Sequence, residues 1–116
     1  MSPIYHIAYP ADWESAKEQG EYRMSTRGRT LEEQGFIHAG EVGQVAPVAN
    51  MIYGEDDELI VLVIDPATLQ SELRYDDVPG WADPFPHIYG PLNIEAVTDT
   101  LPLNKGDDGK FSFSID

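Results

Sequence analysis

The sequence predicts an α+β fold in which two helices pack on a broken, largely antiparallel sheet. Short runs of β-branched and aromatic residues recur along the chain, separated by turn-forming residues (10 glycines and 9 prolines), as is typical of short strands. Two longer segments carry apolar residues at helical spacing, and each ends at a glycine. With 116 residues the chain has the length of a single domain, which we place at 1–116.

The first third of the chain predicts a strand, a helix and a second strand. Ile4–Ala8 is β-branched and aromatic, which favours a strand. We expect a helix to open at Pro10 and stop at Gly20, because proline suits the first turn of a helix and glycine its end. After a polar loop, Thr30 begins a capping-box pattern for a short helical turn, and residues 36–39 form the next strand.

The remaining elements include the strand that we place at the centre of the sheet. Residues 42–53 carry an apolar stripe at helical spacing, which predicts the second helix. Residues 59–64 are apolar on both faces, as expected for a central strand, and Asp65 is positioned to cap the turn that follows. Shorter strands are predicted at 73–75, 87–89 and 94–101, while residues 111–114 either add a last strand or cover the core.

Charge and composition exclude several functions. Seven basic and 21 acidic residues give a net charge of −14, which repels phosphate backbones and anionic lipid surfaces. We therefore expect no DNA or membrane partner and consider RNA a poor substrate, and the sequence identifies no protein partner. The absence of cysteine excludes disulfides and thiolate metal sites. It fits the cytoplasmic location that we expect, since no signal-peptide pattern is visible.

Common catalytic motifs are missing from the sequence. It contains no glycine-rich dinucleotide or phosphate loop and no G-x-S-x-G elbow, which argues against Rossmann, P-loop and α/β-hydrolase enzymes. The acidic runs at 55–58 and 107–109 lack the spacing of a calcium loop, and no other metal-ligand spacing is visible. We interpret these runs as solvated turns and assign no metal-binding residue.

The three histidines are the most informative residues, because each lies in a predicted strand. His6 and His38 share an aromatic and aliphatic setting, and His87 lies between Pro86 and Ile88. Converging imidazoles bind zinc, hold an anionic or nucleotide ligand, or exchange protons near neutral pH. The alternative for each is a buried histidine hydrogen-bonded to the backbone. We expect the three to converge and line a ligand cleft.

The arginines form the one local concentration of positive charge. Arg23, Arg27 and Arg29 fall within seven positions of an otherwise acidic chain. A guanidinium matches the geometry of a carboxylate or phosphate, so these residues are candidates for holding the anionic part of a ligand. The alternative is that they pair with neighbouring glutamates on the surface. Arg74 is expected to pair with one of the two aspartates at 76–77.

Aromatic residues near the histidines are candidates for stacking on a ligand ring. Tyr5 precedes His6, and Tyr89 shares the strand of His87, so we expect both tyrosines to contact the ligand. Trp81 lies in a loop rich in Asp, Pro and Gly, and a loop that carries an aromatic side chain often borders a pocket.

Six motifs, in order along the chain, carry a family resemblance. They are Ile-Tyr-His-Ile-Ala at 4–8, Trp13, Gly-Phe-Ile-His at 35–38, Leu-Val-Ile-Asp-Pro at 62–66, Glu-Leu-Arg at 72–74 and Phe-Pro-His-Ile-Tyr-Gly-Pro-Leu at 85–92. Together they resemble the bacterial family DUF952, a domain of unknown function, over about residues 3–103, which leaves 104–116 as a C-terminal extension. Gly40 departs from the family pattern, where we expect a small hydroxyl residue that caps the second helix.

That family is similar to remote relatives of the ADP-ribosyltransferase fold, in which NAD lies in a cleft between two small sheets. The resemblance implies an ADP-ribosylation-like arrangement with NAD as the cofactor. It also implies that Tyr5 and His6 contact the ADP-ribose part, and that His38 is the catalytic residue, by likeness to the RNA 2′-phosphotransferase branch. Glu95 is the only candidate by position for the late catalytic glutamate of the transferases.

Two functions remain open at this point. The domain is either a NAD- or nucleotide-binding transferase of the ADP-ribosyl or 2′-phosphotransferase type, or a non-catalytic module that binds a small anionic metabolite or a metal. The first function requires a carboxylate such as that of Glu95, whereas the second needs only the histidines. A third interpretation gives the histidines structural roles and makes the acidic surface a face for protein partners. We favour a small-molecule ligand in a histidine-lined cleft.

Overall fold

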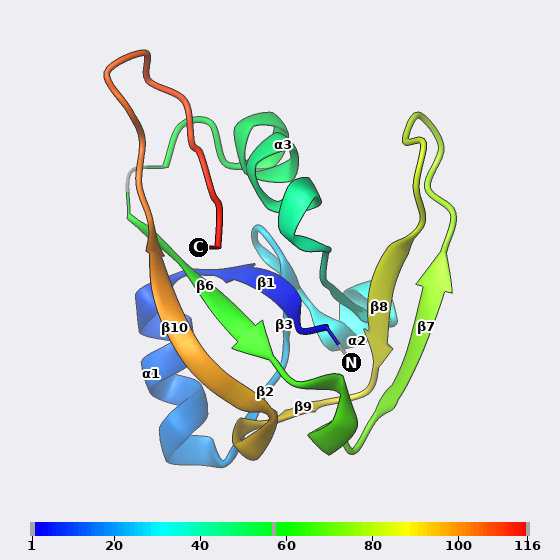
Figure 1. Ribbon diagram of the computed structural model, residues 1–116. Coiled ribbons are helices and arrows are strands. Elements are labelled where there is room, and N and C mark those ends of the chain that lie inside the picture. The colour runs from blue at the N-terminus through cyan, green and yellow to red at the C-terminus, as the bar shows by residue number, and fades with distance from the viewer. Residues whose placement is uncertain (1, 57, 116) are drawn as a thin grey trace.

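The computed structural model describes residues 2–56 and 58–115 and confirms the α+β class (Figure 1). Its helices are α1 (Pro10–Gln19), α2 (Leu31–Gln34) and α3 (Val42–Ile52), with short 3-10 turns η1 (Pro66–Thr68) and η2 (Ile94–Ala96). The strands are β1 (Ile4–Ala8), β2 (Glu21–Tyr22), β3 (Met24–Thr26), β4 (Arg29–Thr30), β5 (Ile37–His38), β6 (Leu59–Ile64), β7 (Glu72–Asp76), β8 (Phe85–Tyr89), β9 (Leu92–Asn93) and β10 (Val97–Leu103).

The described part of the chain forms four small antiparallel sheets, where we predicted a single broken one. It also has three α-helices instead of two, because the helical turn predicted at Thr30 is itself the short helix α2. None of the described helices is long and apolar enough to cross a membrane.

The β6 sheet (β1, β6 and β10) is the centre of the fold, and β6 lies in its middle as predicted. Side chains alternate along a strand, so β6 packs on two sides. Leu62 and Ile64 join the core cluster that contains Trp13 of α1. Leu59 and Val61 join a second cluster, on the face covered by α3. This two-sided burial is why residues 59–64 are apolar throughout.

The β8 sheet (β5, β8 and β7) stands apart from the β6 sheet, as the two-stranded arm of β7 and β8 at the right of Figure 1 shows. Pro86 and Ile88 are buried on one face of β8, and Phe85 and His87 point to the other. A backbone link joins the two sheets. Tyr5 of β1 and Gly40, just after β5, exchange two N–H···O bonds of 2.9 and 2.8 Å.

Residues 21–29, predicted to be a polar loop, belong mostly to three short strands instead, the last of which ends at Thr30. β2 pairs with β9, and β3 pairs with β4 in a hairpin whose turn contains Gly28 at φ 70°. The prediction was wrong here because these strands are two or three residues long and mostly polar, so they carry no hydrophobic periodicity. The partner of β2 also lies far away along the chain.

Most predicted helix and turn ends are confirmed. Gly20 ends α1 in the left-handed region at φ 90°, which glycine adopts without steric cost. Thr30 and Glu33 form the capping box of α2. The Asp65 carboxylate accepts a hydrogen bond of 2.9 Å from the backbone N–H of Ala67. Gly40 does not cap α3, because Glu41 takes that position and forms a capping box with Gln44.

The end of the chain covers the core rather than adding a named strand. Phe111 is buried and Phe113 packs against the cluster on the α3 face of the β6 sheet, so the predicted extension belongs to the hydrophobic core. The predicted strand at 94–101 begins later, at Val97, because Ile94–Ala96 turn into η2 first.

Candidate functional site

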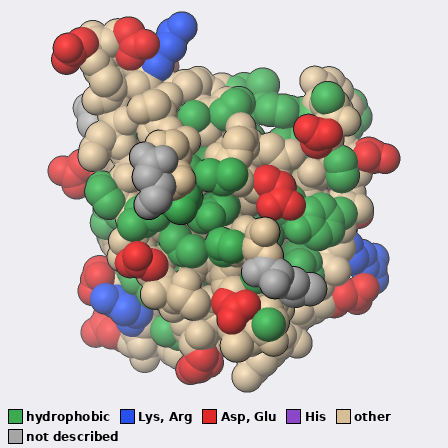
Figure 2. Space-filling model, in the orientation of Figure 1, with side chains coloured by type: hydrophobic (Ala, Val, Ile, Leu, Met, Phe, Trp, Pro, Cys, Tyr) green, Lys and Arg blue, Asp and Glu red, His purple; other side chains and the backbone are tan. Residues whose placement is uncertain are grey.

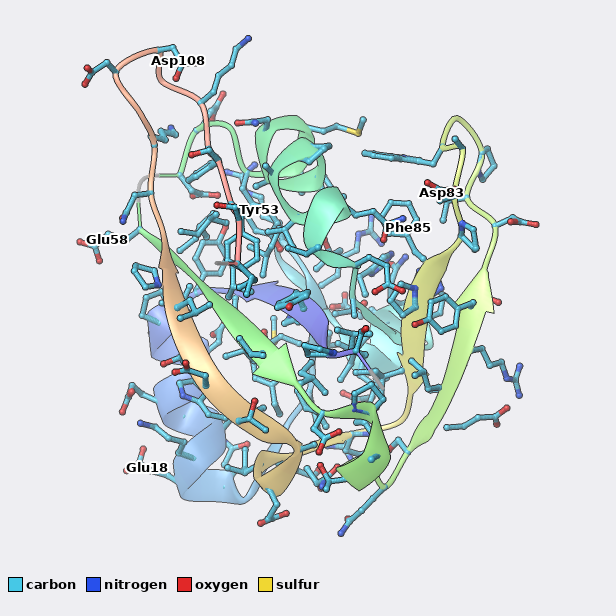
Figure 3. The ribbon with its side chains drawn as sticks, viewed as in Figure 1. Glu18, Tyr53, Glu58, Asp83, Phe85 and Asp108 are labelled. Atoms are coloured by element: carbon cyan, nitrogen blue, oxygen red, sulfur yellow. The ribbon has the colours of Figure 1, made fainter. Side chains whose placement is uncertain are left out.

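A cavity of about 270 Å³ lies between α3 and the β8 sheet. Figure 2 shows the molecule hollowed between α3 and the loop after β7, and Figure 3 labels Tyr53 and Phe85 on opposite sides of this space. All three histidines line it, together with Tyr5. The wall is otherwise mainly apolar, and includes Val45, Val48, Met51, Ile52, Trp81 and Phe85. Trp81 therefore borders the pocket as its loop position predicts.

Strand register explains why two of the histidines meet. In the antiparallel pair of β5 and β8, His38 lies directly opposite His87. Opposite residues on one face of such a pair have their side chains in contact, and the two ring centroids are 5.2 Å apart. Phe36 stacks on the His87 ring at 4.1 Å and an interplanar angle of 19°, which fixes the plane of that imidazole.

A carboxylate determines which nitrogen of His87 carries the proton. The His87 Nδ1 atom lies 2.8 Å from Asp76 Oδ2 of β7, and the Tyr89 hydroxyl donates to the same oxygen at 2.5 Å. Hydrogen bonds from Tyr89 and His87 lower the pKa of Asp76, so this carboxyl is ionised near neutral pH. A carboxylate only accepts hydrogen bonds, and neutral His87 therefore holds its proton on Nδ1.

The other nitrogen of His87 is the distinctive atom of the site. Nε2 is buried, and no group among the described residues hydrogen-bonds to it. With the proton on Nδ1, this atom presents a lone pair. A buried polar atom without a partner costs roughly 1–3 kcal/mol of folding free energy, so native proteins seldom leave one unless it has a task. The His87 side chain is part of the cavity wall, so a molecule in the cavity would lie beside this ring.

His38 is held in its neutral form. Its Nδ1 atom lies 2.9 Å from the Ser25 hydroxyl, which in turn donates to the backbone carbonyl of Phe36. Because the serine proton is used in that second bond, His38 Nδ1 is the donor and Nε2 keeps its lone pair. Burial, and to a lesser degree the nearby His87, lowers the pKa of His38 to about 4. His38 is thus uncharged at neutral pH.

His6 uses both of its ring nitrogens within the fold. Nδ1 donates to the backbone carbonyl of His38, and Nε2 accepts a hydrogen bond of 2.8 Å from the Tyr22 hydroxyl. Burial lowers the pKa of His6 to about 4 against the opposing effect of the His38 carbonyl. These contacts match the alternative of a buried, backbone-bonded histidine. His6 forms part of the cavity wall and fixes β5 against β1.

The three predicted anion-holding arginines lie outside the cavity wall. Arg23 forms ion pairs with Glu21, at 2.5 Å, and with Glu32. Arg27 lies 3.2 Å from Asp56. Arg29 is exposed on β4. The alternative of pairing with neighbouring glutamates describes Arg23, whereas Arg27 pairs with a distant aspartate.

Other candidates also fall at the edge of the site or beyond it. Tyr89 is not in the cavity wall, and its hydroxyl donates a hydrogen bond to Asp76. The Arg74 guanidinium lies 4.6 Å from the centroid of the Tyr89 ring. Arg74 pairs with Glu72 at 2.6 Å, which corrects the prediction that it pairs with an aspartate at 76–77. Both side chains extend from β7 on one face, two residues apart. Glu95 is exposed on η2 and does not line the cavity.

Sequence reasoning missed the residues that support the imidazoles, above all Asp76 and Ser25. A signal for Asp76 was available, because the predicted strands 73–75 and 87–89 flank one loop and pair as a hairpin. In the observed register Arg74 faces His87, and Asp76 is the diagonal neighbour on the same face. Ser25 offered no such signal, since it lies in the unpredicted strand β3. No group of three or more histidine, aspartate or glutamate side chains suited to a metal gathers among residues 2–56 and 58–115.

Comparisons with known proteins give a family and a fold. Residues 7–100 match the family described as protein of unknown function (DUF952). The crystal structure of protein CC0527 from Caulobacter crescentus superimposes with a TM-score of 0.82 at 29% identity, covering 96% of this chain and 94% of that one. The solution NMR structure of CC0527 gives a TM-score of 0.75 at 32% identity, covering 95% and 91%. No curated protein matches. The chain belongs to the DUF952 family.

Proposed function

We propose that this domain binds a small, uncharged, planar molecule in the cavity, held by a hydrogen bond donated to Nε2 of His87. The observation that carries the proposal is the buried lone pair of that atom, which has no partner among the described residues. Asp76 fixes the tautomer and Phe36 fixes the ring, so the acceptor is preorganised before a ligand arrives.

The size and polarity of the cavity support a ring-shaped ligand. A volume of about 270 Å³ is at the lower end of ordinary ligand pockets, enough for one ring system with small substituents. Aromatic and aliphatic side chains form most of the wall, and they favour a flat apolar body.

The charge of the wall supports an uncharged ligand over the anionic metabolite that the sequence left open. Among the described residues, none of the side chains that line the cavity is a lysine or arginine. His6 and His38 are neutral near pH 7, because burial lowers the pKa of each to about 4. An anion would therefore enter an apolar site of an acidic protein without a counterion, which is costly.

NAD fits this wall only in part. A nicotinamide or adenine ring matches the apolar surface, and its amide or amino N–H suits His87 Nε2, but the wall offers no cation for the pyrophosphate. The exposed position of Glu95 also leaves the wall without the carboxylate that ADP-ribosyl transfer needs. We therefore propose binding of a ring, and treat the intact dinucleotide as the competing ligand in the test.

Long-range proton–nitrogen NMR of the three imidazoles tests the proposal. The titrants are three uncharged rings (nicotinamide, adenine and 5-nitrobenzisoxazole) and two anions (NAD and AMP). We expect at least one uncharged ring to shift the His87 Nε2 resonance saturably, with little change at His6, whose nitrogens are already paired. The Trp81→Ala variant should weaken the response by removing part of the wall.

Two results would overturn this proposal. One is saturable binding of NAD or AMP with no response to any uncharged ring, which would restore the nucleotide interpretation. The other is an Nε2 resonance of His87 that none of the five compounds moves.

A further inference from the structure

We propose that His87 and Asp76 form a proton-accepting dyad, in which Nε2 of His87 removes a weakly acidic proton from the uncharged planar molecule bound in the cavity. The inference rests on the proposed binding function and deepens it by naming the substrate class. That class comprises flat, uncharged molecules with a weakly acidic C–H, N–H or O–H group directed at the imidazole.

The orientation of the imidazole is the first support. A general base needs a lone pair within hydrogen-bond reach of the bound molecule and a second contact that fixes the tautomer. His87 lines the cavity with Nε2 unpartnered, and Asp76 Oδ2 lies 2.8 Å from Nδ1. The stacked ring of Phe36 restricts rotation of the imidazole.

The fate of the positive charge is the second support. An imidazolium buried in an apolar wall is costly unless a counterion is already in place. Protonated His87 would form an ion pair with Asp76 without any rearrangement. Tyr89 also donates to this carboxylate, whose side chain is 35% exposed, so the pair keeps contact with solvent for return of the proton.

The contrast with His38 identifies the base. Both residues line the cavity, but His38 Nδ1 is held by the Ser25 hydroxyl, which cannot balance a positive charge. The catalytic role that the family resemblance implies for His38 therefore passes to His87 in this proposal. His38 forms an uncharged part of the cavity wall next to His87.

Elimination of 5-nitrobenzisoxazole is a suitable probe reaction, because this compound is flat and uncharged and needs only a base. Nε2 takes the proton from the ring carbon next to nitrogen, and the C–H electron pair becomes the third bond of a nitrile. The N–O bond breaks at the same time, and its electron pair leaves on the oxygen as a coloured phenolate. The proton passes from His87 to solvent, so no oxidant, reductant or cofactor is consumed.

Turnover by the full chain and by three variants tests the dyad. We expect His87→Gln to lower the rate about 10²-fold or more, which is the usual contribution of a general base. Asp76→Asn should also lower the rate, and imidazole NMR should show His87 losing its single Nδ1–H tautomer, which a merely structural aspartate would not cause. Glu72→Gln makes the same carboxylate-to-amide change on β7, where the carboxylate pairs with Arg74 and does not bond to His87, and it should leave the rate unchanged.

The outcomes separate this inference from the proposed function. If the probe shifts the His87 resonance but wild type, His87→Gln and Asp76→Asn convert it equally fast, the dyad is overturned while binding stands. If the probe neither binds nor reacts while nicotinamide or adenine binds, the dyad is overturned for this substrate class. Circular dichroism of each variant shows whether it is folded. If His87→Gln does not fold, Asp76→Asn provides the test, because its side chain is partly exposed.

Discussion

Two walls of the cavity contain a histidine with the same degree of burial, and the two residues differ in their hydrogen-bond partners. His6 in β1 and His87 in β8 are each 3% exposed. Both nitrogens of His6 are hydrogen-bonded within the fold, whereas His87 leaves Nε2 without a partner among the described residues. Burial alone therefore does not separate these two histidines, but the hydrogen-bond partners of each nitrogen do, and this difference is the basis of the role proposed for His87.

The two sheets that carry these histidines also differ in how many of their faces pack in the hydrophobic core. The β6 sheet packs against a hydrophobic cluster on each face, and this burial stabilises the fold. The β8 sheet buries Ile88 on one face and directs His87 and Phe85 into the cavity on the other. One side of the molecule builds the fold, and the other uses one face of a small sheet to present a site.

The largest expected effect comes from His6→Phe, which should lower the free energy of unfolding by roughly 3–4 kcal/mol. The substitution leaves the Tyr22 hydroxyl and the His38 carbonyl without their partners. Urea denaturation measures the loss. Tyr22→Phe is the matched control, and the double variant should cost less than the sum of the two, because no orphaned hydroxyl remains. If the losses of unfolding free energy in the two single variants simply add in the double variant, the structural role that we assign to His6 is wrong.

Acid should remove the same stabilisation. The pKa of His6 is lowered from 6.5 to about 4, so between these values the unfolded chain binds a proton that the folded chain does not. Stability is thus complete above pH 6.5 and falls as pH drops toward 4, by about 3 kcal/mol for His6. His38 acts in the same direction. Denaturation at several pH values should show wild type and His6→Phe converging near pH 4, and a constant difference between them would contradict this.

His87→Phe should change the free energy of unfolding by less than about 1 kcal/mol, because losing the Asp76 contact is offset by removing an unpartnered buried nitrogen. The same variant should abolish the rise in melting temperature that a bound ring gives wild type. Thermal unfolding with and without the ligand measures both quantities. If His87→Phe loses as much stability as His6→Phe, His87 is a structural residue like His6 and the difference that we infer between them is wrong.

The smallest effects are expected at the arginines. Arg23→Ala and Arg27→Ala each remove exposed ion pairs, which contribute roughly 0–1 kcal/mol. Neither residue lines the cavity, so ligand titrations of both variants should match wild type. A weakened response in either would show that the site extends to the β3–β4 hairpin, and would revive the prediction that these residues hold an anion.

Elements with a clear local sequence pattern could be predicted. Strands whose partners lie far away in the sequence could not. The apolar run 59–64 identified the central strand, and Gly20 and Thr30 identified helix ends. β2 was missed because its partner β9 lies far away in sequence, and no pattern within two residues records that pairing. Strand pairing of this kind is decided by tertiary contacts.

Of the candidate site, the sequence indicated the three histidines and Tyr5 but not the hydrogen-bond partners of the imidazoles. Three histidines in strands pointed to a shared cleft, and all three line the cavity. Their roles depend on second partners such as Asp76 and Ser25, which register and an unpredicted hairpin bring into place. An anion-holding role for the arginines stays a prediction, although Arg23 and Arg27 form surface ion pairs and lie outside the cavity wall.

The backbone link between Tyr5 and Gly40 has a kinetic consequence. Its two hydrogen bonds, with the bond from His6 to the His38 carbonyl, fasten the floor of the cavity, so the sheets have little freedom to separate there. A molecule bound as proposed would then leave past more exposed lining residues, such as Met51, which is 68% exposed, and Trp81. Residence time should depend on these side chains, and substitutions at the floor should leave the dissociation rate nearly unchanged.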